Sequence, residues 1–97
     1  MSYTILVHKD KVLDHIHKLE NTRKHEDTIQ ILADNPYPGS GIGDKKQLSD
    51  KFTEIDNQKL FRIRSGQHRA IYSIDEGSKT IFVFDFFKKK SGKYGVY

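Results

Sequence analysis

Two stretches of alternating apolar and polar residues, 59–64 and 68–75, constrain the fold of this 97-residue chain more than any other feature. Successive side chains of a β-strand point to opposite faces of a sheet, so each stretch predicts a strand with one buried face. The residues between them, Ser65-Gly66-Gln67, are typical of a tight turn, and the two strands are therefore expected to form an antiparallel hairpin. A second turn at 75–78 leads to an almost continuously apolar stretch, 79–87, which predicts a central third strand.

The N-terminal half has a different periodicity. Residues 3–8 predict a short strand, and from residue 9 the apolar residues fall on one helical stripe: Val12, Leu13, Ile16 and Leu19. Asn21 and Thr22 can end this helix and cap a second one, which is expected to bury Ile29, Leu32 and Ala33. It should stop before Asn35-Pro36, because the residue before a proline resists helical angles. Residues 35–43 read as a loop, and residues 46–55 are ambiguous, with a short extended piece around Leu48 and an irregular turn as one interpretation.

The predicted element order is thus β-α-α-β-β-β. We expect one α+β domain over residues 1–97, in which an N-terminal α-hairpin packs on a small, mainly antiparallel, twisted sheet. The chain has no cysteine, which excludes a disulfide framework and a thiolate metal site. It has no apolar run of the ~20 residues that a membrane span needs, and no signal-peptide pattern, so we expect a soluble, cytoplasmic protein without a membrane partner.

Positive charge gathers in the part of the chain that reads as sheet. Residues 1–58 carry 8 Lys and Arg against 10 Asp and Glu, whereas residues 59–97 carry 9 against 3, a net charge of +6. Arg62 and Arg64 share one strand face, and Arg69 follows the turn, where it can stand beside them. Like charges placed side by side cost stability unless an anion binds them. Polyanion binding is one interpretation; the other is a solvated face with lysines that protect a sheet edge.

The hairpin sequence Leu-Phe-Arg-Ile-Arg-Ser-Gly-Gln-His-Arg-Ala-Ile-Tyr, residues 60–72, resembles a family motif. It is similar to the Y-R-I-R-x-G-x-Y-R-x-I-Y hairpin of the RelE/ParE superfamily of type II toxin–antitoxin toxins. The run-up, Asn35-Pro-Tyr-Pro followed by Lys45-Lys-Gln-Leu48, also matches, and residues 86–90 resemble the F-x-K-K ending of the HigB branch. The element order agrees along nearly the whole chain. The resemblance implies a RelE-like fold.

In function, the resemblance implies a metal-independent endoribonuclease that cleaves mRNA, usually on the ribosome. In RelE-like members the ribose 2′-OH attacks its own 3′ phosphodiester and leaves a 2′,3′-cyclic phosphate. By position, Arg62, Arg64 and Arg69 match the basic residues of the hairpin, and Lys88 or Lys89 matches the one after the last strand. Tyr94 matches a C-terminal aromatic residue that stacks on a base or aids proton transfer, and Tyr97 is the alternative for this position. Lys90 and His68 are possible additional site residues.

The identity of the general base stays open. Many relatives carry lysine at the first pair, where this chain has Arg62 and Arg64, and an arginine is rarely deprotonated. Lys88 or Lys89 could serve if crowding by cations lowers a lysine pKa. His68 titrates near neutrality, but strand alternation turns it away from Arg69.

The implied partners are a cognate antitoxin, which could form a hetero-oligomer with the chain, and the ribosome with its mRNA. We expect no cofactor and no metal: His15 and His17 lie on different faces of a helix and cannot bind one metal ion together. Two alternatives remain. One is a ParE-like toxin that inhibits a topoisomerase without nuclease chemistry, and the other is a degenerate relative that only binds nucleic acid or an antitoxin.

Overall fold

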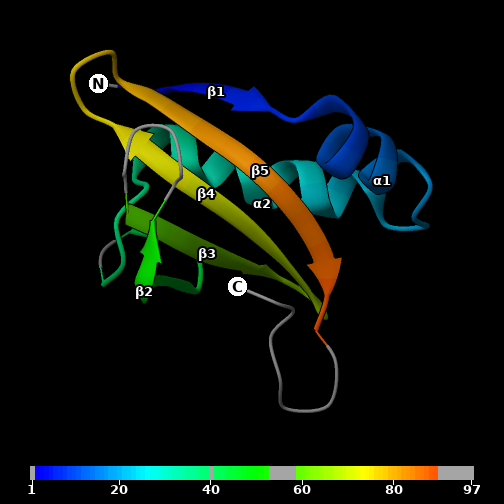
Figure 1. Cartoon of the computed structure of the whole chain (residues 1–97). Coiled ribbons are helices and arrows are strands. Elements are labelled where there is room, and N and C mark those ends of the chain that lie inside the picture. The colour runs from blue at the N-terminus through cyan, green and yellow to red at the C-terminus, as the bar shows by residue number, and fades with distance from the viewer. Residues whose placement is uncertain (1, 40, 53–58, 90–97) are drawn as a thin grey trace.

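Five strands form one mixed sheet with the order β1-β5-β4-β3-β2. The computed structural model describes residues 2–39, 41–52 and 59–89. The strands are β1 (Thr4–Val7), β2 (Lys45–Phe52), β3 (Lys59–Ser65), β4 (His68–Asp75) and β5 (Thr80–Lys88). β1 pairs with β5 in parallel, and the other neighbours are antiparallel. The helical segments lie on one face of the sheet (Figure 1), so the opposite face is available for a binding site.

The predicted hairpin is confirmed in its strands and its turn. β3 and β4 pair from Leu60 with Ser73 to Ser65 with His68, which leaves a two-residue turn at Gly66 and Gln67. Gly66 has a φ of +62°, a left-handed conformation that glycine adopts without steric cost. The hairpin therefore holds the residues before and after the turn in a fixed cross-strand register.

Two details of the predicted sheet are wrong. The sheet has five strands rather than four, because the extended piece around Leu48 is a full strand, β2, that pairs with β3. The apolar strand β5 lies second in the order, between β1 and β4, and β4 occupies the middle of the sheet. A strand paired on both sides is shielded from water on both edges, which explains the apolar character of β5 without placing it at the centre.

The helical region forms the predicted α-hairpin (Figure 1). One turn of π-helix, η1 (Lys9–Leu13), continues directly into α1 (Asp14–His17), and α2 (Thr22–Asp34) follows. Asn21 takes the N-cap position without a side-chain hydrogen bond, whereas the Thr22 hydroxyl donates to the carbonyls of Ile16 and Leu19 and closes the turn between the helices. α2 ends where predicted, at the residue before Asn35-Pro36.

One apolar cluster joins the helices to the sheet. Its buried members come from both layers: Val12, Ile16, Ile29, Leu32, Phe61, Ile63, Ala70, Tyr72, Ile81, Val83 and Phe86. The Tyr72 hydroxyl donates to the carbonyl of Pro36 at 2.6 Å, which ties the loop after α2 to the middle strand. Ala33, expected in the core, is only half-buried. No helix among the described residues is long and apolar enough to span a membrane.

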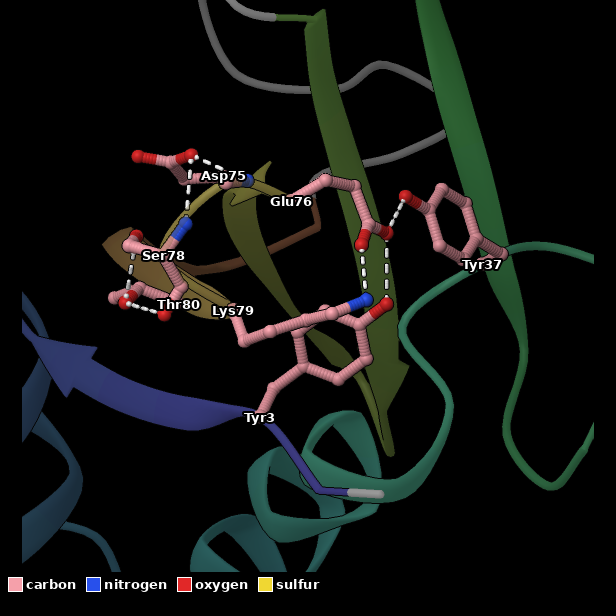
Figure 2. A network of polar contacts seen from close by, with 8 residues as sticks. Tyr3, Tyr37, Asp75, Glu76, Ser78, Lys79 and Thr80 are labelled. Carbon is pink, nitrogen blue, oxygen red and sulfur yellow. Dashed lines mark hydrogen bonds and ion pairs between the residues drawn. The ribbon is translucent and has the colours of Figure 1, made fainter.

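A polar cluster closes the sheet at the turn between β4 and β5. The Glu76 carboxylate accepts hydrogen bonds from the hydroxyls of Tyr3 and Tyr37, and its other oxygen lies 2.6 Å from Lys79 Nζ (Figure 2). These bonds lower the pKa of Glu76 to about 2, with Lys79 as the largest cause. Asp75 accepts from the backbone of Gly77 and Ser78 in the same turn. The acids of this turn therefore have a structural role.

Candidate functional site

Three arginines stand together on the sheet face opposite the helices. Arg64 and Arg69 are direct cross-strand partners in β3 and β4, and Arg62 lies two residues before Arg64 on the same strand face. The neighbouring positions Ile63 and Ala70 belong to the helix-facing core, which fixes the arginines on the other side. We call the surface of Arg62, Arg64 and Arg69 the arginine face. Its assembly from the two hairpin strands follows the sequence prediction.

Arg69 is held against the hairpin turn. Its side chain is buried, with a residue exposure of 6%, and Nη1 donates to the carbonyls of His68 at 2.9 Å and Gly66 at 3.3 Å. Its Nε is buried and has no hydrogen-bond partner among the described residues. A buried guanidinium retains its charge, so these contacts orient a cation whose donors are only partly used.

Arg64 completes the pair across the turn from an exposed position. Its Nε donates to the Gly66 carbonyl at 3.2 Å, so both arginines of the pair contact the same backbone oxygen. Two guanidinium groups in this arrangement repel one another unless an anion binds both. The pair is thus a favourable position for a phosphate.

Arg62 lies deeper and contacts an acidic residue that the sequence interpretation did not single out. Its Nη1 is 3.4 Å from the Asp44 carboxylate and 3.3 Å from the Asp44 carbonyl. The same carbonyl accepts the backbone N–H of Arg64 at 2.9 Å. Asp44 therefore connects to both arginines of β3 from the end of the loop after α2.

The preceding residue, Gly43, explains why Asp44 can come so close. Gly43 has a φ of +100°, and a Cβ there would lie 3.2 Å from Ile63 Cδ1. A glycine thus lets the loop pass over β3 in a left-handed conformation. The glycine-rich composition of the loop signalled a special backbone but could not show which residue it positions.

Strand β2 adds one more cation to this face. Lys46 is the cross-strand partner of Arg62, and its side chain is exposed. Its neighbour Lys45 pairs with Ile63 on the helix-facing side, where burial lowers the pKa of its ammonium group and Nζ donates to the Asn35 carbonyl at 2.7 Å. Sequence reasoning missed the role of both lysines because no periodicity marked β2.

The candidate lysines at the end of β5, Lys88 and Lys89, do not lie on the same side of the sheet. Lys88 pairs with His68 and therefore belongs to the helix-facing side of the sheet. Lys89 follows β5, and its backbone N–H donates to the Gln67 carbonyl at 2.8 Å, which holds it beside the hairpin turn. Lys89 is one residue past β5, so continued alternation predicts its side chain on the side of the arginine face. Lys90 and Tyr94, which were also predicted, lie outside the described residues.

His68 points away from Arg69, as alternation predicted, and joins a histidine cluster behind the turn. Its ring stacks on Phe86 with centroids 5.0 Å apart, and the ring of His25 lies 5.0 Å from it, edge to face. His15 approaches at 6.1 Å. His25 Nδ1 shares a hydrogen bond of 2.6 Å with the Ser65 hydroxyl. The cluster thus anchors the hairpin to α2.

Burial and neighbouring cations disfavour the protonated forms of His25 and His68. Desolvation is the main cause that lowers the pKa of His25 and of His68, and Lys24 adds to it for His25. Packing between rings is therefore the role that the geometry gives to His68. Among the described residues, no group of three or more His, Asp or Glu side chains is arranged to hold a metal ion.

Two solved structures resemble this fold over almost their full length. The archaeal RelE–RelB complex from Pyrococcus horikoshii contains a chain with a TM-score of 0.71 and 26% identity, and the alignment covers 91% of the present chain and 96% of that one. The RelBE2 toxin–antitoxin complex of Mycobacterium tuberculosis gives a TM-score of 0.55 at 20% identity, with 92% and 100% covered. No family model and no curated protein sequence matches the chain. The chain has a RelE-like fold, and the resemblance seen in its hairpin extends to its structure.

Proposed function

We propose that this RelE-like chain is the toxin component of a type II toxin–antitoxin system and cleaves mRNA as an endoribonuclease. The observation that carries the proposal is the arginine face, in which Arg64 and Arg69 form a cross-strand pair with Arg62 beside them. The solved structures with the same fold are toxin–antitoxin complexes, which supports the toxin assignment. The cytoplasm, where mRNA and ribosomes are found, is the compartment in which such an activity operates.

The proposed chemistry needs no metal. The ribose 2′-OH attacks the adjacent phosphorus, the bond from phosphorus to the 5′ oxygen breaks, and the products carry a 2′,3′-cyclic phosphate and a 5′-OH. The three arginines stabilise the negative charge that grows on the phosphorane oxygens. A base must take the proton of the 2′-OH, and an acid must protonate the leaving 5′ oxygen.

Lys89 is the proposed base among the candidates that the structure describes. Arginine remains protonated at neutral pH, and Lys88 and His68 belong to the opposite side of the sheet. In this proposal Tyr94 stacks on the base that is read or assists proton transfer, and Lys90 supplies additional charge.

The partners follow from the same proposal. The mRNA substrate is cleaved on the ribosome, and a cognate antitoxin covers the cationic surface with an acidic segment and forms a hetero-oligomer with the toxin. Charge complementarity of this kind speeds association and suppresses wrong partners. Co-purification with the product of an adjacent short, acidic reading frame tests the antitoxin.

The function is tested by inducing the chain in growing cells and mapping the 5′ ends of cellular mRNA. The proposal expects growth arrest and new 5′-OH ends within codons. Arrest with intact mRNA and stalled replication would instead support a toxin that acts on a topoisomerase. Normal growth in cells that accumulate the folded chain would support a relative that has lost activity and only binds nucleic acid or an antitoxin.

A further inference from the structure

Strand β2 carries two neighbouring lysines in opposite environments. Lys45 is buried on the helix-facing side, where its ammonium group donates to a backbone carbonyl. Lys46 is exposed and forms no hydrogen bond or ion pair with the described part of the chain. Because the two are adjacent in one strand, only the register of β2 against β3 decides which of them reaches the arginine face.

The register places Lys46 directly beside Arg62. The two are cross-strand partners, so their side chains leave the sheet on the same face. Arg62 has a partner in Asp44, but that carboxylate is shared with solvent, being 55% exposed. Two cations at adjacent positions are unfavourable in the free protein, and an anion bound between them removes the repulsion.

The arginine face extended by Lys46 has two cationic rows. One row runs across the strands from Lys46 to Arg62, and the next runs from Arg64 to Arg69. Rows two residues apart along a strand are separated by ~7 Å. A single nucleic-acid strand carries phosphates at regular intervals, so it can place successive phosphates on successive rows.

We propose that Lys46 is a further substrate-binding residue, which contacts an RNA phosphate next to the one held by Arg64 and Arg69. This inference rests on the proposed ribonuclease function. Lys46 lies one row from the reacting phosphate, so it contributes to binding of the RNA backbone and not to the chemical step. Its contact is to phosphate and is independent of base sequence.

A different reading of Lys46 is a lysine that protects an edge strand, since β2 lies at the edge of the sheet. Such a lysine prevents association between sheets but has no preference for RNA. The two interpretations predict different effects on RNA affinity when the charge of Lys46 is removed. A matched control is available in Lys59, an exposed lysine at the start of β3 whose position alternates onto the helix-facing side with Phe61.

The binding experiment uses a single-stranded RNA oligonucleotide with 2′-O-methyl sugars, which cannot be cleaved by 2′-OH attack. Fluorescence anisotropy measures its affinity for the wild type, Lys46→Ala and Lys59→Ala over a range of salt concentrations. We expect Lys46→Ala to weaken binding about three- to tenfold and to reduce the slope of log affinity against log salt by about 1. Lys59→Ala, with the same loss of net charge, should stay within about twofold of the wild type.

A cleavage assay on programmed ribosomes adds a readout that a structural role would not move. Lys46→Ala should raise KM with kcat unchanged, because it removes binding that ground state and transition state share. Lys46→Arg should restore the wild-type KM. Thermal unfolding of Lys46→Ala and of the polar variant Lys46→Gln should match the wild type, since Lys46 has no described partner to lose.

The outcomes separate the two proposals. If the wild type cleaves mRNA but Lys46→Ala and Lys59→Ala bind RNA equally well, Lys46 is only an edge residue and the inference is overturned. A fall in kcat at unchanged KM would also overturn it, because Lys46 would then act in the chemical step. If the wild type neither binds nor cleaves RNA, the proposed function itself fails and the inference fails with it.

Discussion

At the residue scale, the Arg69 guanidinium is oriented by the protein and keeps a donor that an anion could use. It is buried, its Nη1 is fixed by two turn carbonyls, and its Nε has no partner among the described residues. The side chain thus lies on the sheet face away from the apolar cluster and adds little to the core. Its contribution should therefore appear in activity more than in folding.

Arg69→Ala is expected to abolish toxicity, with a fall in cleavage rate of about 10²- to 10³-fold, the usual effect of losing one preorganised donor to a developing charge. The two lost bonds to carbonyls lower the free energy of unfolding by about 1–3 kcal/mol. Growth after induction, cleavage rate and urea unfolding measure the three quantities. Arg69→Lys should not restore activity, because an ammonium group lacks the planar fork of donors. A folded, fully toxic Arg69→Ala variant would show that the proposed site is wrong.

Asp44 is expected to position Arg62. Its carboxylate and carbonyl both contact Arg62 Nη1, and the carbonyl also binds the Arg64 backbone. Asp44→Asn removes the charge and keeps the backbone contacts, so cleavage should slow by up to about fivefold, the limit for a partly exposed ion pair. RNA affinity should not fall, because a negative charge is lost near the phosphate.

The double variant tests whether Asp44 acts through Arg62. In an Arg62→Ala background, Asp44→Asn should have no further effect on the cleavage rate, since the group that it orients is gone. Additive losses in the double variant would mean that Asp44 acts on the substrate independently of Arg62.

At the scale of elements, the loop that ends at Asp44 depends on Gly43. Both Gly39 and Gly43 have left-handed backbone angles, but only a Cβ at Gly43 would press on a neighbour, Ile63 Cδ1, while none lies within 4 Å of Gly39. Gly39→Ala should cost about 1–2 kcal/mol of unfolding free energy, from backbone strain alone. Gly43→Ala should cost more and should also slow cleavage, because it moves Asp44. Urea unfolding and cleavage assays on both variants check this; equal losses of stability and intact activity would contradict the role of Gly43.

The sequence predicted the elements whose signals are local. Alternation over residues 59–75 is a property of neighbouring residues, so the hairpin and the grouping of its arginines could be read directly. β2 could not be read, because its pattern is set by pairing with β3 and not by its own alternation. For the same reason Asp44 and Lys46, which reach the arginine face only through that pairing, had no signal of their own.

The histidine cluster shows the same limit across longer distances. His25, in α2, meets Ser65 forty residues later, and His68 was considered for its chemistry and not for its packing. Alternation did predict that His68 turns away from Arg69. What it turns toward depends on how α2 crosses the sheet, and no local pattern of the sequence contains that information.

At the scale of the whole molecule, the hairpin has two faces in different environments. Its outer face carries the arginines, and its inner face is fixed to α2 through Ser65, which bonds to His25 at 2.6 Å and to the Thr28 hydroxyl at 3.2 Å. A change at the inner face therefore reaches the turn that holds Arg69. Protonation of the cluster is such a change, because it places charge between packed rings.

The neighbourhood of the cluster opposes that protonation. Desolvation lowers the pKa of both His25 and His68 from 6.5, and the nearby charges that lower it further are all cationic when protonated. They come from four adjoining elements: Lys24 in α2, His15 in α1, Arg69 in β4 and Lys88 in β5. The acidic groups near the cluster are Asp10 and Asp85, which line a cavity together with His15 and with the cations Lys11 and Lys18.

Stability should consequently fall as the solution is acidified below pH 6.5. In that range the unfolded chain binds protons at His25 and His68 more readily than the folded chain does. The two neutral histidines therefore make their full contribution to the unfolding free energy above pH 6.5, and this contribution decreases below it. We therefore expect the unfolding free energy to be lower at pH 5.5 than at pH 7.5. Glu76 has its pKa lowered from 4.5 to about 2, so its stabilising contribution is also lost on acidification. That loss begins only below pH 4.5, outside this window.

Urea unfolding at the two pH values measures this dependence, and His68→Phe isolates its origin. A phenyl ring can keep the stacking on Phe86 and has no proton to bind, so the difference between pH 5.5 and pH 7.5 should shrink. His8→Asn removes an exposed imidazole elsewhere, while asparagine can still cap the helical turn that His8 caps through Lys11, so the difference should persist. If both variants keep the full difference, the acid sensitivity does not come from the cluster, and the link between the two faces of the hairpin loses its support.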